Sequence, residues 1–215
     1  MAESPTTDEK VINHDLLTKE GWESYLAHTR NELARRHRDA DTELVELQLV
    51  VTCDPRTGVP LPRPMVTWVV TRFQSSTDNA EIVKEGFVLQ ARAMAVAGQA
   101  IASIFCSEVW ISHYENKIPA NRPQPKDDPN RIEALTMMSD HRDFGPQMAQ
   151  AVISLDGPTR TIEPWKIFDG NLGGRMSSFV PPRQSDPSTT ALCRELINEL
   201  IATKHMEMID LKDPT

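Results

Sequence analysis

Apolar residues in the first quarter of the chain recur with a helical period and then with a strand period. Residues 18–38 carry an apolar stripe at every third or fourth position, at Trp22, Leu26, Thr29 and Leu33. This spacing predicts an amphipathic helix on the outside of the domain. Strict alternation over residues 45–53 then predicts a half-buried strand, with Glu46 and Gln48 on its polar face.

The next segments predict a hairpin and a buried helix. A turn at residues 54–58 leads to a stiff loop, because prolines 60, 62 and 64 cannot donate ladder hydrogen bonds, and a second strand spans residues 65–73. Asp78 and Glu81 form a capping box at the start of a helix that extends to about Ile101. Its positions are mostly small and apolar, which is typical of a helix packed against a sheet.

The second half of the chain predicts further strands. Residues 103–111 are apolar on both alternating faces, as in a sheet interior, and they place one carboxylate, Glu108, in that interior. A polar arm over residues 116–130, expected to be exposed and mobile, precedes strands at 131–138 and 147–155, which flank a charged turn. Pro164 makes the run 159–168 an edge strand or splits it. Asp186 and Pro187 begin an amphipathic last helix.

These segments predict an α+β fold. We expect a mostly antiparallel sheet of about six strands, a buried central helix and amphipathic terminal helices, because tight turns between strands favour antiparallel pairing over a βαβ series. At 215 residues the chain fits one domain. We place that domain at residues 15–205, after a disordered lead over residues 1–14 and before a tail over residues 206–215.

Charge and cysteine content narrow the function classes. A net charge of −8 disfavours nucleic-acid binding, which requires a basic surface. The basic run 35–38 is expected to cap the first helix, as are His37 and His205 at helix ends. Three distant cysteines, Cys53, Cys106 and Cys193, predict buried free thiols in a reducing cytoplasm. Long apolar runs and a leader pattern are both lacking, so we expect neither a membrane span nor export.

Five residues of the second half have side chains that bind divalent metals or move protons, namely Glu108, His113, Asp140, His141 and Asp143. Their spacing matches no zinc motif, and the glycine-rich stretch 169–175 lacks a phosphate-loop pattern, so no metal or cofactor is expected. We instead expect a solvated turn, together with a structural Glu108 paired with Arg131 or Arg142.

The layout Glu108-Val109-Trp110, a proline-rich arm, residues 128–135 (DPNRIEAL) and a following hairpin resembles that of uncharacterised proteins encoded in bacterial and bacteriophage genomes. The resemblance covers roughly residues 91–156. It implies a bacterial or phage source and no particular activity.

We therefore expect a non-enzymatic, intracellular interaction or accessory protein that binds itself as a homodimer, or another protein, through an edge strand or an amphipathic helix. Trp165, near the expected edge, is a candidate exposed aromatic residue. One alternative is a metal-dependent hydrolase or nuclease that uses Glu108 and the turn at Asp140 to Asp143. Another is a small-ligand binding module with a pocket between the sheet and the central helix.

Overall fold

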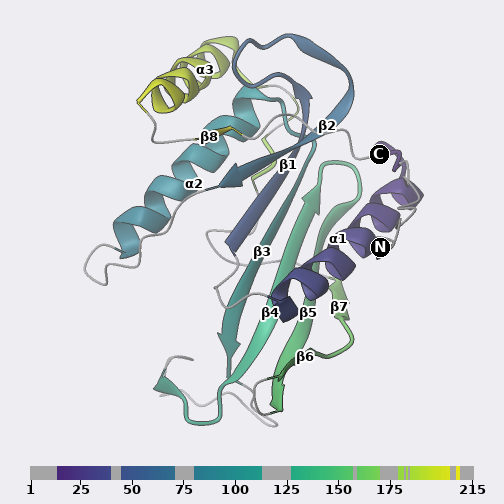
Figure 1. Ribbon diagram of the computed structural model, residues 1–215. Coiled ribbons are helices and arrows are strands. Elements are labelled where there is room, and N and C mark those ends of the chain that lie inside the picture. The colour runs from purple at the N-terminus through teal and green to yellow at the C-terminus, as the bar shows by residue number, and fades with distance from the viewer. Residues whose placement is uncertain are drawn as a thin grey trace, which may run out of the picture.

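The computed structural model describes residues 14–39, 45–70, 80–112, 127–156, 159–169, 179–181, 183, 185–203 and 207–208. These residues form three helices and eight strands, which confirms the predicted α+β class (Figure 1). The helices are α1 (Lys19–Asp39), α2 (Ala80–Ala97) and α3 (Pro187–Ala202). The strands are β1 (Val45–Cys53), β2 (Pro60–Val70), β3 (Ala102–Ile111), β4 (Ile132–His141), β5 (Gly145–Asp156), β6 (Thr159–Ile162), β7 (Lys166–Asp169) and β8 (Glu207–Met208).

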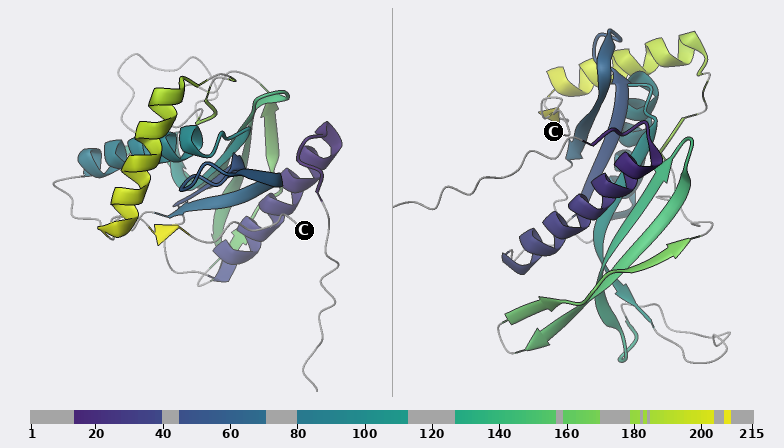
Figure 2. Two further views of the ribbon diagram at one scale, coloured as in Figure 1. Left: turned by 90° about the horizontal axis from the view of Figure 1, so that it is seen from above. Right: turned by 90° about the vertical axis from the view of Figure 1, so that its right-hand side faces the viewer.

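All eight strands belong to one antiparallel sheet. Their order is β6-β5-β4-β3-β1-β2-β8, and β7 pairs with β5 beside β6. Helix α1 crosses one face of the sheet, whereas α2 and α3 lie on the other face (Figure 2). The sheet has more strands than the six expected because the run containing Pro164 is split into β6 and β7, and because two residues of the expected tail pair with β2 as β8.

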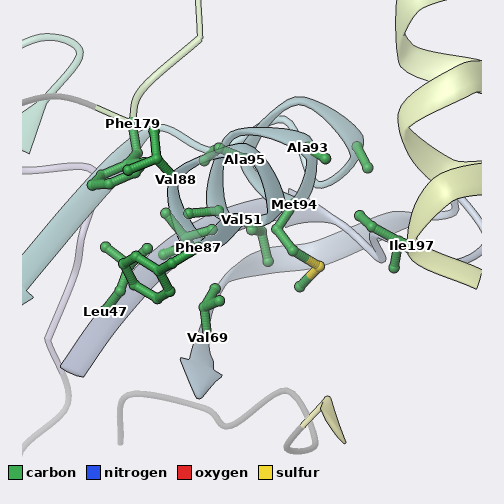
Figure 3. Close-up of a cluster of buried hydrophobic side chains, with 14 of the residues drawn as sticks. Leu47, Val51, Val69, Phe87, Val88, Ala93, Met94, Ala95, Phe179 and Ile197 are labelled. Atoms are coloured by element: carbon green, nitrogen blue, oxygen red, sulfur yellow. The ribbon is translucent and has the colours of Figure 1, made fainter. Parts of the chain in front are cut away.

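Helix α2 packs against the sheet through small side chains, as its composition predicts. Ala91, Ala95 and Met94 are fully buried, and α3 adds Ile197, which points toward α2 (Figure 3). The helix ends at Ala97, and the carbonyl of Gly98 then accepts hydrogen bonds from the amides of Thr52 and Cys53, both at 3.0 Å. Side chains of this cluster fill the space between α2 and the sheet.

Helix α1 covers a second apolar cluster on the opposite face. Trp22, Leu26 and Leu33 pack there against residues of β3, β4 and β5 such as Ile104, and Leu16 joins them from the turn before the helix. The predicted amphipathic first helix is thus confirmed. Because helices cover both faces of the sheet, its central strands are buried on both sides.

Two predictions for the first hairpin were wrong. Strand β1 is buried on both faces, since Glu46 and Gln48 lie beneath α1 rather than in solvent. Strand β2 begins at Pro60 and includes the three prolines of the expected loop. In the described part of the chain, β8 pairs only with Val69 and Val70, so the proline stretch needs ladder hydrogen bonds on one side only.

Several predicted features lie outside the described residues. These are residues 1–13 of the N-terminal lead, the proposed cap at Asp78, His113, most of the polar arm, His205 and most of the glycine-rich stretch. The last residue of the expected lead, His14, is described and is buried. One described residue of the arm, Asp128, is buried, against the expectation of full exposure. Its side-chain Oδ1 accepts the Asn130 amide at 2.9 Å, and its backbone carbonyl accepts the amide of Arg131 at 3.1 Å, so it shapes the turn before β4.

Candidate functional site: the Glu108 cluster and the outer strand

Glu108 lies on the face of β3 that α1 covers. Side chains alternate along a strand, so Glu108 shares this face with Ile104 and Cys106, which are both buried in the cluster under α1. The side chain of Glu108 is itself only 11% exposed. A carboxylate at this depth requires cationic or hydrogen-bonding partners, because an unpaired buried charge costs several kcal/mol.

The partners of Glu108 come from α1 and β6. Arg160 of β6 places Nη2 3.5 Å from Glu108 Oε1, and His37 of α1 places Nε2 3.4 Å from Glu108 Oε2. Arg160 Nη1 also lies 3.1 Å from His37 Nε2, so the three side chains contact one another. We call Glu108, His37 and Arg160 the Glu108 cluster. It joins three elements that are far apart in the sequence.

The predicted partners of Glu108 occupy other positions. The guanidinium of Arg131 lies 4.3 Å from the centre of the Trp110 ring, and Arg142 Nη2 donates to the carbonyl of Ala100 at 2.7 Å. Trp110 is 42% exposed, although the sequence pattern of residues 103–111 predicted a sheet interior. The sequence could have indicated His37, because it follows Leu33 by four residues and so continues the buried stripe of α1.

Burial controls the protonation of His37, whose side chain is 0% exposed. Desolvation lowers its pKa below the usual 6.5 and the positive charge of Arg160 lowers it further, whereas the charge of Glu133 acts in the opposite direction. His37 is therefore neutral at pH 7. The expectation that it only caps the helix was wrong.

A second polar group lies beside the Glu108 cluster under α1. Arg36 Nη2 pairs with Glu46 Oε2 at 2.9 Å, and the indole N–H of Trp68 donates to Glu46 Oε1 at 3.0 Å. The hydroxyl of Tyr25 donates to Gln48 Oε1 at 2.8 Å, and burial raises the pKa of this phenol. These contacts satisfy the polar side chains of β1 that the sequence placed in solvent.

The charged turn holds a buried histidine. His141 lies at the end of β4, stacks on Phe144 at 4.1 Å between ring centres, and is buried. Its Nδ1 accepts the amide of Asp143 at 3.1 Å, so the proton of the neutral ring is on Nε2, which donates to the carbonyl of Leu16 at 3.2 Å. Burial also lowers the pKa of His141. The expectation of a solvated turn was wrong at this residue.

The two carboxylates beside His141 belong to the hairpin itself. Asp140 lies within β4, opposite Ser103. Asp143 lies in the tight turn between β4 and β5, and its carboxylate pairs with Arg183. Gly145 ends this turn with φ +81°. That turn is a three-residue connection followed by a left-handed residue, a common hairpin form.

The structure does not bring Glu108 and the charged turn together. In the β3–β4 register Glu108 lies opposite Leu135, whereas Asp140 lies opposite Ser103, five positions away along β3. Five residues of strand correspond to ~17 Å. In the described ranges, no group of three or more His, Cys, Asp or Glu side chains is arranged to hold a metal ion.

The three cysteines are free thiols. Cys53 and Cys106 are buried, and Cys193 is half-buried. Burial raises the pKa of Cys106 well above its usual value and, to a smaller extent, that of Cys193. Thiols with raised pKa values are poor nucleophiles at neutral pH.

The outer strand β7 exposes apolar side chains on both faces. Ile167 is 51% exposed and Phe168 is 43% exposed, although adjacent residues of a strand point to opposite sides. The expected exposed residue, Trp165, instead packs against the cluster under α1. Strand β7 pairs with β5 along one edge, and no pairing with its other edge occurs within the described part of the chain.

Comparisons with known proteins do not assign this chain to a family. No family model, curated protein or solved structure matches it. Among the described residues, no helix is both long and apolar enough to cross a membrane.

Proposed function

We propose that this chain is an intracellular interaction protein that forms a homodimer through the edge of β7. The observation that carries the proposal is the pair of exposed apolar side chains, Ile167 and Phe168, on a strand at the end of the sheet. An edge strand presents unpaired backbone groups that can pair with another strand. Ile167 and Phe168 would then lose water on both faces of such a contact.

Symmetry favours a second copy as the occupant of this edge. A two-fold axis perpendicular to the sheet makes two β7 strands antiparallel and keeps each face on the same side. Directly opposed residues must then point to the same face. With Ile167 on the axis, it lies opposite Ile167 of the other copy, and Phe168 lies opposite Lys166. These are an apolar pair and an aromatic–cation pair, so the strand is self-complementary.

The residues that resemble an active site support a non-enzymatic role. Glu108 is held by His37 and Arg160, and both ring nitrogens of His141 have backbone partners. Titratable side chains that are fixed in this way stabilise the fold and leave no acid or base free at either position. Glu108 and His141 therefore do not compete with the edge of β7 as the basis of the proposal.

Light scattering on the purified chain at high micromolar concentration tests the proposal. We expect a dimer, and we expect Ile167→Lys with Phe168→Lys to give a folded monomer. The matched control is Leu192→Lys with Leu196→Lys, which changes exposed apolar residues on α3 in the same way and should leave the dimer intact. A wild-type monomer would refute the proposal, and a monomer produced only by the α3 variant would assign the interface to that helix.

A further inference from the structure

His37 occupies a position whose hydrogen bonds require one particular protonation state. A guanidinium can only donate, so the 3.1 Å contact from Arg160 Nη1 makes His37 Nε2 an acceptor. The proton of the neutral ring is then on Nδ1. That atom is buried and makes no hydrogen bond within the described residues.

Charged groups from three other elements act on the ring. Arg160 approaches from β6 and Glu108 from β3, at 3.1 and 3.4 Å from Nε2, and Glu133 of β4 acts from farther away. Arg36, the preceding residue of α1, is paired with Glu46 of β1. The Nε2 atom therefore faces the guanidinium of Arg160, which requires its lone pair, and the carboxylate of Glu108, which can accept a hydrogen bond from a protonated ring.

A proton on Nε2 reverses these two contacts. The nitrogen loses the lone pair that accepts from Arg160, and two positive groups then face each other across the same short distance. The new N–H group can instead donate to Glu108 Oε2 as a charge-assisted hydrogen bond. Arg160 is the partner able to leave, because its side chain is already 27% exposed whereas His37 is fully enclosed.

We propose that protonation of His37 exchanges the partner of Glu108 from Arg160 to His37 and thereby releases β6 from α1. One proton is taken from solvent, and the arginine keeps its charge as it moves into water. Strand β6 has only four residues, and its Arg160 contacts His37 of α1, so it is the element that the exchange loosens. The released strand lies next to β7 on β5. The inference does not depend on the proposed dimer.

Nitrogen-15 spectra of the histidine side chains in the full-length protein provide the first test. At pH 7.5 we expect His37 to be the Nδ1–H tautomer, and we expect its titration midpoint to lie below that of the unfolded protein. Either an Nε2–H tautomer at pH 7.5 or a midpoint above the unfolded value would overturn the proposal. This measurement requires no substitution.

Hydrogen exchange supplies the second test. After correction for intrinsic rates, the amides of β6 should lose protection between pH 7.5 and pH 5, while those of β7 on the same edge keep theirs. The loss should be absent in His37→Gln. It should persist in the matched control His28→Gln, which changes an exposed histidine on the same helix. Equal loss in wild type and His37→Gln, or no loss in wild type, would refute the exchange.

Discussion

Glu108 shows why an isolated carboxylate in a strand is weak support for catalysis. Its alternation with Ile104 and Cys106 places it under α1, and the fold then supplies His37 and Arg160 as partners. Removing one member of a buried ionic group leaves the others without compensation, which costs more than the group contributes as a whole. The contacts of Glu108 with His37 and Arg160 therefore explain it as a structural residue.

We expect Glu108→Gln to lower the free energy of unfolding by about 1–3 kcal/mol, because the amide leaves the guanidinium of Arg160 without its buried anion. Urea denaturation measures the change. Glu195→Gln, an exposed position on α3, is the control and should change stability by no more than about 0.5 kcal/mol. A loss no larger than that of the control would contradict a structural role for Glu108.

Metal ions give a second measurement on the same pair of proteins. Mg²⁺, Mn²⁺ or Zn²⁺ should leave the melting temperature of the unmodified chain unchanged. The partners of Glu108 are the nitrogen atoms of Arg160 and His37, and no set of acidic ligands surrounds it among the described residues. Only a ligand that binds the native state raises its stability by mass action. A metal-dependent rise that disappears in Glu108→Gln would favour the metal-dependent hydrolase or nuclease instead.

At the scale of elements, the end of α2 and strand β1 approach each other at Gly98. A Cβ built on Gly98 would lie 2.6 Å from Val51 Cγ1, and the Gly98 carbonyl already accepts the Thr52 and Cys53 amides. The backbone of the connection thus lies directly on the strand. Gly86, near the middle of the same helix, has open space at its Cβ position.

These two glycines predict opposite effects of the same substitution. Gly98→Ala should destabilise the protein by about 1–3 kcal/mol, because the methyl group overpacks against Val51. Gly86→Ala should stabilise it by about 0.5–1 kcal/mol, because alanine restricts the unfolded chain and favours the helix. Thermal unfolding of both variants measures the difference. Equal effects would mean that β1 can move away from Gly98.

At the scale of the whole molecule, the sequence predicted those helix and strand boundaries that depend on residues close together in the chain. The alternation over residues 45–53 gave the bounds of β1, and Asp186 with Pro187 begins α3, where Asp186 accepts the amide of Thr189 at 3.0 Å. Pro164 separated β6 from β7 as predicted. Each of these features depends on local backbone chemistry.

The sequence could not predict what depends on tertiary packing. Gln48 is buried because α1 crosses β1, a contact that alternation alone does not contain. The partners of Glu108 could not be chosen because Arg160 and His37 reach it from β6 and α1, far away in the chain, whereas Arg131 is near it in the β3–β4 hairpin but stacks on Trp110. Of the three residues in the Glu108 cluster, the sequence therefore identified only Glu108 as a candidate site residue.

Burial of histidines makes the stability of the whole molecule depend on pH. Burial lowers the pKa of His14, His37 and His141 below the ordinary 6.5, so near pH 6 the unfolded chain binds more protons than the folded one. The stabilisation is fully present above pH 6.5 and is lost as the pH falls below it. Carboxylates with lowered pKa values, such as Asp54, act in a more acidic range.

We therefore expect the free energy of unfolding to decrease from pH 7.5 to pH 5.5 in urea titrations, and less so in His141→Gln than in His28→Gln. A free energy that is constant or rises over this interval would show that these histidines are protonated in the native state, and that the hydrogen bonds made by His37 and His141 differ from those described.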